Sequence, residues 1–309
     1  MSRAVLAAVC VLAAGAVCGC GATTAGYRAG EIYCCGGTDV FVIDADAARA
    51  DPAGRVWSWR ADDSPRIAIP HRAWFAAIDE CKPVLGGSAV LVAASSGGGV
   101  ALIRRADKAC LFYAGGRNAH SAELVGDDLL AGTFSFRSDQ VRLYRLRGRV
   151  HAARPAFVMK LAGAHGVVWD RARKVLWALG SAELLKLKIA RQPAPSAEVV
   201  KRWKLPAPGG HDLFALDDRH LGVTVGAGVY RFDAAAETFT PLPGLADAAG
   251  VKSLCRHPDT GRIIYTQGEP TFTNKVRCLG AADLTLPPAN LYKARWNAPN
   301  RFSYAAPDR

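Results

Sequence analysis

Short apolar runs, separated by glycine-rich or polar turns, recur along the chain from residue 31 to residue 296. In several runs apolar and polar residues alternate, as in Arg55-Val-Trp57-Ser-Trp59-Arg60, and this is the period of two of a half-buried strand. Four runs fill a stretch of roughly 40 residues, which is the length of one four-stranded propeller blade. The pattern therefore predicts an all-β protein made of repeated small sheets.

The runs group into six units, and we expect a six-bladed β-propeller, with seven blades as the alternative. The first unit is one strand short, with runs at 31–35, 40–44 and 55–60. The second to fifth units each hold four runs, and the sixth holds runs at 251–255, 262–266, 275–279 and 291–296. A ring must close to protect its sheet edges, so we expect the tail Arg301–Tyr304 to supply the missing strand.

One short phrase opens three successive units. It reads Asn118-Ala-His120-Ser-Ala-Glu123, then Gly163-Ala-His165-Gly, then Gly209-Gly-His211-Asp212. The histidines are 45 and 46 residues apart, as equivalent positions in neighbouring blades would be. Equivalent positions on inner strands converge at the axis of a propeller, so we expect the three imidazoles to meet there.

Three converging imidazoles would suit Mn, Zn or Fe, so we expect His120, His165 and His211 as candidate ligands of a divalent metal. Such a metal could acidify a C–H bond beside a carbonyl or carboxylate while a nearby lysine or carboxylate moves the proton. The candidates for that proton transfer are Lys252, Lys82 and Glu80. Residues expected to orient the rings or to line the pocket are Asp79, Glu123, Trp169, Asp170 and Asp212.

The same histidines also fit a metal-free pocket for a sugar, or a purely structural role in which each ring bonds to a neighbouring blade. Three functions therefore remain open. They are a metal-assisted carbohydrate-active enzyme of lyase type, a noncatalytic glycan or small-ligand binding protein, and a protein-interaction scaffold. The other four histidines fall in loops or turns and are expected at the surface: His71, His151, His220 and His257.

The N-terminus is typical of an export signal. Arg3 is followed by an apolar segment from Ala4 to Val17 and then by small residues, so we expect a signal peptide at 1–22, a linker at 23–30 and the propeller at 31–309. Val17-Cys18-Gly19-Cys20 is similar to a lipobox, with Cys20 as the lipidated residue, and cleavage near Ala22 or Ala25 is the alternative. The expected location is the periplasm or the cell surface. We expect the six cysteines outside this leader to be small buried apolar residues.

The chain has 39 Lys and Arg against 27 Asp and Glu, which gives a formal net charge of +12. For an exported protein this charge would attract an acidic carbohydrate or an anionic surface, because the long-range field raises encounter rates, and solvated strand faces are the alternative explanation of the charge. No nucleic-acid-binding motif is present, so we expect no nucleic-acid partner. We expect a monomer that meets a membrane only through the possible lipid anchor.

These phrases, together with Val175-Leu-Trp-Ala-Leu-Gly180 and Gly250-Val-Lys-Ser253, resemble those of a family of exported bacterial six-bladed propeller proteins with no assigned activity. The resemblance covers nearly all of the chain after the leader and implies the propeller fold. A more distant resemblance is to the oligogalacturonate lyases, which are propellers that hold manganese with several histidines. That resemblance implies His120, His165 and His211 as ligands, and the remaining ligand of the pattern has no counterpart in this sequence.

Overall fold

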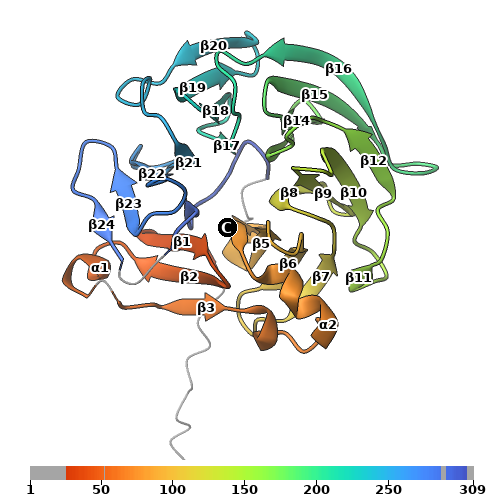
Figure 1. Cartoon of the computed structure of the whole chain (residues 1–309), viewed down its shortest axis with the longest axis horizontal. Coiled ribbons are helices and arrows are strands. Elements are labelled where there is room, and N and C mark those ends of the chain that lie inside the picture. Colours follow the sequence, from red (N-terminus) through yellow and green to blue (C-terminus); the bar gives the residue numbers. More distant parts are fainter. Residues whose placement is uncertain (1–25, 52, 287–289, 305–309) are drawn as a thin grey trace, which may run out of the picture.

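The computed structural model describes residues 26–51, 53–286 and 290–304, and it shows a six-bladed β-propeller. The six sheets follow one another around a ring in chain order (Figure 1). The predicted signal peptide, with Cys20, lies outside the described residues. None of the helices among the described residues has the length and hydropathy to cross a bilayer.

The first three blades contain most of the short helices. Blade 1 has β1 (Glu31–Gly36), β2 (Asp39–Asp44) and β3 (Trp57–Trp59), and blade 2 has β4 (Ile78–Val84), β5 (Ala89–Ala94), β6 (Val100–Arg104) and β7 (Cys110–Ala114). Blade 3 has β8 (Ala119–Val125), β9 (Leu129–Phe134), β10 (Gln140–Arg145) and β12 (Phe157–Lys160). Helix α1 (Ala47–Ala50) follows β2, and α2 (Ile69–Arg72) precedes β4. An unexpected short strand, β11 (His151–Ala152), pairs in parallel with β7 and widens blade 2.

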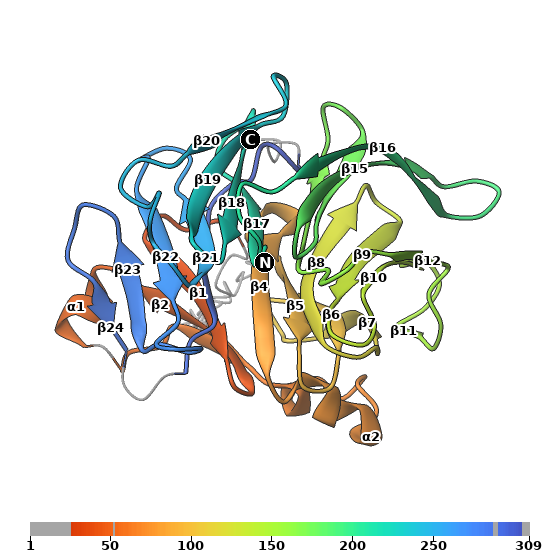
Figure 2. The same ribbon diagram turned by 45° about the horizontal axis from the view of Figure 1, so that its top comes forward.

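Blades 4 to 6 are regular antiparallel sheets. They are β13 (Gly166–Asp170), β14 (Val175–Leu179), β15 (Glu183–Ala190) and β16 (Ser196–Lys204), then β17 (Asp212–Ala215), β18 (His220–Val225), β19 (Gly228–Asp233) and β20 (Thr238–Pro241), then β21 (Val251–Arg256), β22 (Ile263–Gln267), β23 (Lys275–Cys278) and β24 (Leu284–Thr285). The long β15–β16 hairpin extends outwards from the ring (Figure 2).

The ring is closed by β25 (Lys293–Trp296), which is the innermost strand of blade 1. It pairs with β1 in antiparallel register, from Ile32 opposite Trp296 to Cys35 opposite Lys293. Gly36 permits the close approach of the incoming chain, since a Cβ there would lie 1.7 Å from the carbonyl oxygen of Asn290.

Closure therefore joins both ends of the chain, as the short first unit predicts, but the strand assignment made from the sequence was wrong. Residues 291–296 do not form the outer strand of blade 6, because β24 takes that place. Residues Arg301–Tyr304 form a turn rather than a strand. This strand has four residues, two of which are cations, so its sequence pattern does not indicate whether it is the innermost or the outermost strand of a blade.

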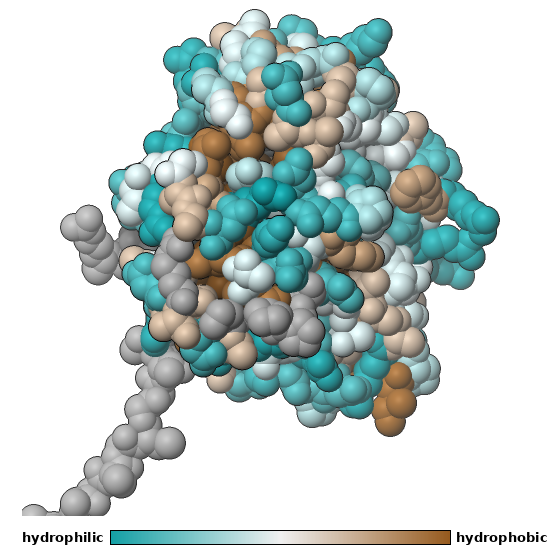
Figure 3. Space-filling model, turned by 60° about the vertical axis from the view of Figure 1, so that its left-hand side comes forward, coloured by the Kyte–Doolittle hydropathy of each residue, from teal (hydrophilic) through white to brown (hydrophobic). Residues whose placement is uncertain are grey.

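The core lies between neighbouring blades. Between blades 1 and 2, for example, Tyr33, Trp59, Phe75 and Val92 belong to one buried apolar cluster. The six described cysteines are buried, as expected. On the side shown in Figure 3, hydrophilic side chains cover most of the surface and apolar groups show mainly in recesses between them.

Candidate functional site

One residue from each blade lies at the start of an inner strand, and these six residues together form what we call the axial ring. They are Asp79, His120, His165, His211, Lys252 and Tyr292. Asp79, His120 and Lys252 each occupy a β-bulge, where the pairing register of the inner strand shifts by one residue. A bulged residue is unpaired and its side chain is re-aimed, so these bulges turn three of the six side chains out of the regular alternation.

The imidazoles of the axial ring contact one another. The rings of His120 and His165 stack with centroids 4.1 Å apart, and His211 meets His165 edge to face at 5.0 Å. Asp79 Oδ2 lies 3.0 Å from His120 Nδ1, and Lys252 Nζ lies 3.1 Å from His211 Nε2. The expected meeting of His120, His165 and His211 is therefore present, with Asp79 and Lys252 beside them.

Burial determines the charge state of the ring. His120 and His165 are each 5% exposed, and burial together with nearby positive charge lowers the pKa of His120, His165 and His211 to about 3. The imidazoles are therefore neutral at pH 7. Burial also raises the pKa of Asp79 to about 7, and it lowers the pKa of Lys252.

Several ring nitrogens are buried without a hydrogen-bond partner. Both nitrogens of His120 and Nδ1 of His211 are in this state, since the short approach of Asp79 to His120 lacks hydrogen-bond geometry. In contrast, His165 Nδ1 donates to the carbonyl oxygen of Gly163 at 2.8 Å. Buried polar atoms are nearly always bonded to protein or to water, so the His120 and His211 nitrogens are available to a hydroxyl group or to water.

The arrangement does not fit the metal centre that the three histidines predict. Imidazole lone pairs lie in the ring plane, so the stacked rings of His120 and His165 direct theirs side by side rather than towards a shared point. His211 Nε2 faces the Lys252 ammonium, which takes its lone pair. Among the described residues, no group of three or more His, Cys, Asp or Glu side chains is placed to hold a metal ion.

Below the axial ring lies a buried network of charges, which we call the ion-pair layer. Arg295 bonds to Glu80 at 3.0 Å and to Asp212 at 2.6 Å, and Lys293 lies 3.3 and 3.0 Å from the same two carboxylates. Burial alone would raise the pKa of Glu80 and of Asp212. The cations Arg295 and Lys293 outweigh it, so that the pKa of Glu80 is lowered to about 2 and the pKa of Asp212 is also lowered. This layer joins blades 1, 2 and 5.

Two residues expected to transfer protons, Glu80 and Lys82, lie in this closed layer, and only Lys252 lies in the axial ring. Lys82 donates to Ser121 Oγ, to Glu123 and to the carbonyl oxygen of Val167. Glu80 is fully buried.

The residues expected to orient the histidines have other partners. The Asp212 carboxylate accepts from Arg295 and from the Leu254 N–H, and Asp170 accepts from Arg173 and Trp177. Glu123 accepts from Lys82 and Tyr304. Among the described residues, no hydrogen bond or ion pair joins these three carboxylates to a histidine ring, and Trp169 lies against a cavity at the other end of the axis.

Tyr292, Lys293 and Arg295 belong to the site and were missed because their strand was assigned to blade 6. The sequence signal that could have identified Tyr292 is its distance from Lys252, which is about one blade length. Phe136 and Phe272 were also missed. Their rings lie 6.3 Å from His165 and 6.1 Å from Tyr292, and both side chains are exposed.

Of the other histidines, His257 is buried, contrary to expectation. Its ring packs edge to face on Trp296, and its Nδ1 accepts from the N–H groups of Asp259 and Thr260 in a turn. His71, His151 and His220 are partly exposed.

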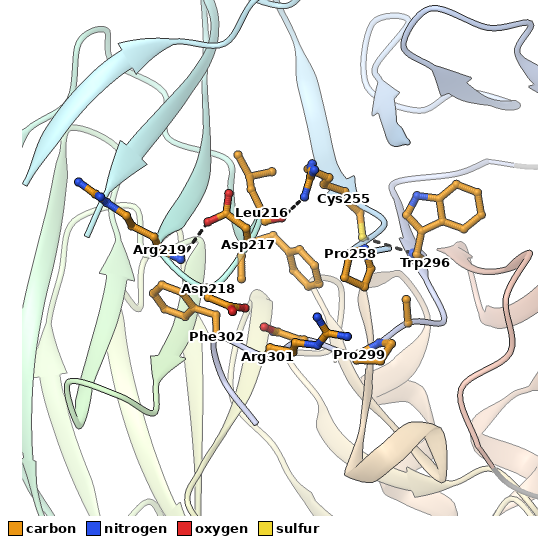
Figure 4. Close-up of a pocket in the computed structure, with 15 residues that line it drawn as sticks. Leu216, Asp217, Asp218, Arg219, Cys255, Pro258, Trp296, Pro299, Arg301 and Phe302 are labelled. Atoms are coloured by element: carbon orange, nitrogen blue, oxygen red, sulfur yellow. Dashed lines mark hydrogen bonds between the residues drawn. The ribbon is translucent and has the colours of Figure 1, made fainter. Parts of the chain in front are cut away.

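Two cavities lie at the opposite end of the axis, beside the C-terminal segment. One, of about 310 Å³, is lined by Arg219, Arg256, Trp296, Arg301 and Phe302 (Figure 4). Another, of about 850 Å³, is lined by Trp169, Lys174 and Tyr304. These two cavities provide open space at the end of the axis opposite the axial ring.

The fold and the axial ring define a six-bladed β-propeller with a polar imidazole cluster at one end of its axis. The chain matches, over residues 38–308, the family described as a family of unknown function (DUF6528), and it belongs to that family. No curated protein matches the chain.

Solved structures share the fold at low identity. A chain of the nidogen/laminin complex is 10% identical with a TM-score of 0.57, over 86% of this chain and 97% of that chain. A chain of the mitotic checkpoint complex is 15% identical with a TM-score of 0.50, over 84% of this chain and 78% of that chain. At these identities the likeness concerns the fold alone.

Proposed function

We propose that the axial ring binds a carbohydrate, and that the preferred ligand is an acidic oligosaccharide. The observation that carries this proposal is a continuous row of rings across this end of the propeller. Phe272 and Tyr292 lie 6.1 Å apart, Tyr292 and His120 6.3 Å, His120 and His165 4.1 Å, and His165 and Phe136 6.3 Å. Ligand sites typically combine such aromatic surface with a few well-placed polar groups.

Phe136 is the most informative member of this row. Its side chain is 69% exposed, and it has a φ of 29° in a loop where Arg137 and Asp139 also have positive φ. Each such residue costs roughly 1–3 kcal/mol, and strained positions cluster at binding and catalytic sites. An exposed phenylalanine held in a strained loop beside His165 supports a stacking role for this residue.

The polar groups beside the row favour an acidic sugar. Lys252 provides a part-exposed cation, and the unpartnered nitrogens of His120 and His211 can bond to hydroxyl groups. The net charge of +12 favours encounter with an anion. We place this binding in the periplasm or at the cell surface, because residues 1–22 are typical of an export signal.

The test is a glycan array of acidic and neutral oligosaccharides, followed by calorimetry with the bound glycans. Phe136→Ala should weaken binding at least tenfold. Val200→Ala removes a side chain of comparable exposure (54%) from the outer strand β16, and it should bind like the wild type. Absence of array binding, or equal affinity of Phe136→Ala and the wild type, would contradict the proposal.

A proton-transfer enzyme of lyase type is the second candidate, and the pair of Asp79 and His120 favours it. The Asp79 carboxyl group has a pKa of about 7, so it can accept or donate a proton near neutral pH, and the neutral His120 imidazole lies 3.0 Å from it. In such an elimination a base removes the C–H proton beside a carboxylate, a C=C bond forms, the neighbouring C–O bond breaks, and the leaving oxygen takes a proton from an acid.

Ultraviolet absorbance of the unsaturated product would report this activity on each bound glycan. Asp79→Asn should abolish turnover while leaving glycan affinity within about threefold. If the wild type forms no product from any bound glycan, the lyase activity is ruled out and only the binding function remains. Metal analysis of the wild type and of a His165→Ala variant, after loading with Mn, Zn and Fe, tests the conclusion that the axial ring does not fit a metal centre. Stoichiometric metal in the wild type that is lost in His165→Ala would overturn it.

A further inference from the structure

Two adjoining cavities form a long groove at the end of the axis opposite the axial ring. The larger, of about 850 Å³, runs from blade 2 across blade 3 to blade 4, and the smaller, of about 340 Å³, lies between blades 2 and 3. They share a wall of Leu85, Leu124, Gly126 and Asp127. Sites for small ligands typically measure about 300–1,000 Å³, so the groove has the size of a ligand site.

The part of the groove over blades 2 and 3 is mainly apolar. The smaller cavity is lined by Leu102, Leu111, Phe112 and Leu146 together with the exposed Arg147, and it continues past Leu124. Leu85 stands between the two cavities, 49% exposed, with a φ of 51°. Leucine is rare in the left-handed region and is usually buried, so an exposed leucine in this conformation is a feature that needs a reason.

The part of the groove over blade 4 is positively charged. Arg171, Lys174 and Arg191 line it, and Arg191 forms an ion pair with Asp128 at 3.2 Å. Arg171 and Lys174 are exposed, and neither has an ion pair among the side chains that the structure describes. The acidic lining residue, Asp127, lies at the junction of the two cavities, away from the blade 4 turn that carries Arg171 and Lys174.

We infer that this groove binds a single-chain anionic amphiphile, such as a free fatty acid. Its carboxylate lies over Arg171 and Lys174, and its chain runs past Leu124 and Leu85 into the apolar cavity. The asymmetry of the groove selects this ligand class, since cations at one end and an apolar wall at the other complement a charged head and an apolar tail. This site is separate from the axial ring and does not depend on the function proposed there.

Calorimetric titration of the whole protein with laurate, below the concentration at which it forms micelles, tests the inference. Dodecanol has the chain without the charge, and butyrate has the charge without most of the chain. Leu85→Asp suits the left-handed backbone and places a carboxylate in the shared wall, and Lys174→Glu reverses one cation. Arg154→Glu, at another exposed arginine outside the groove, is the control for net charge.

Support consists of saturable binding of one laurate, with dodecanol and butyrate each at least tenfold weaker. Leu85→Asp and Lys174→Glu should each lose at least tenfold in affinity, while Arg154→Glu binds like the wild type. Thermal melting of each variant reports whether it is folded. The inference is overturned if laurate does not saturate the protein, if folded Leu85→Asp binds it normally, or if only phosphatidylglycerol vesicles and not laurate are bound.

Discussion

Replacing Arg295 with methionine should destabilise the propeller more than any single change at its surface. The Arg295 side chain is fully buried and donates five hydrogen bonds, four to Glu80 and Asp212 and one to the carbonyl oxygen of Leu254. Methionine has a similar length but no charge. In the variant, two buried carboxylates would share Lys293 as their nearest remaining cation.

The magnitude follows from this uncompensated charge. Removing one partner from a buried ion pair costs about 3–5 kcal/mol, because the other partner stays buried and charged. Domains have about 5–15 kcal/mol of unfolding free energy, so about a fifth or more of the total would be lost. With a urea m-value of about 3 kcal/mol/M, the midpoint should fall by about 1–2 M.

Urea unfolding followed by tryptophan fluorescence measures this loss. The exposed pair of Arg219 and Asp233, at 2.6 Å, provides the control, and Arg219→Met should cost less than about 1 kcal/mol. The double variant Glu80→Gln, Arg295→Met should recover part of the lost stability, because it leaves one carboxylate, Asp212, beside the remaining cation Lys293. If the unfolding free energy of Arg295→Met is within about 1 kcal/mol of the wild-type value, the ion-pair layer does not stabilise the ring.

Two further predictions concern stability. Burial raises the pKa of Glu123 to about 7, against 4.5 in the unfolded chain. Between pH 4.5 and pH 7 the native state therefore binds more protons than the unfolded state. The free energy of unfolding should fall as pH rises through this range, by about 3 kcal/mol for this group. Glu123→Gln should flatten that part of the profile of melting temperature against pH, and an unchanged slope would refute the assignment. Phe302 is 3% exposed and lies within the core cluster of blades 4 and 5. Phe302→Ala should therefore lower the free energy of unfolding in urea by about 3–5 kcal/mol. Arg301 beside it is exposed, so Arg301→Ala should leave the free energy of unfolding nearly unchanged. Equal midpoints for these two variants would show that the C-terminal segment does not stabilise the ring.

The architecture could be predicted because it is repetitive. Each blade repeats the same alternation and the same turn spacing, so an error in one strand leaves the count unchanged. The meeting of His120, His165 and His211 could be predicted for the same reason. The closing strand could not, because Lys293 and Arg295 are charged and their burial depends on Glu80 and Asp212, which lie far away in the sequence.

The partners of the axial residues were hard to predict because a shift of one or two positions along a strand changes the direction and the location of a side chain. Asp212 directly follows His211, so its side chain points to the opposite face of the strand. Glu123 is three positions beyond His120, which corresponds to about 10 Å along a strand. The bulges at Asp79, His120 and Lys252 and the strained loop at Phe136 leave no periodic signal in the sequence.

The position of β25 has a consequence for how the protein is made. Residues 293–296 leave the ribosome after all five complete blades, although their place is beside β1, near the start of the ring. Until they emerge, β1 has an open inner edge, and Glu80 and Asp212 lack the cations that neutralise them in the native state. Nascent chains should therefore remain in an unclosed and protease-sensitive form until β25 pairs with β1, and this pairing makes folding of the whole ring cooperative.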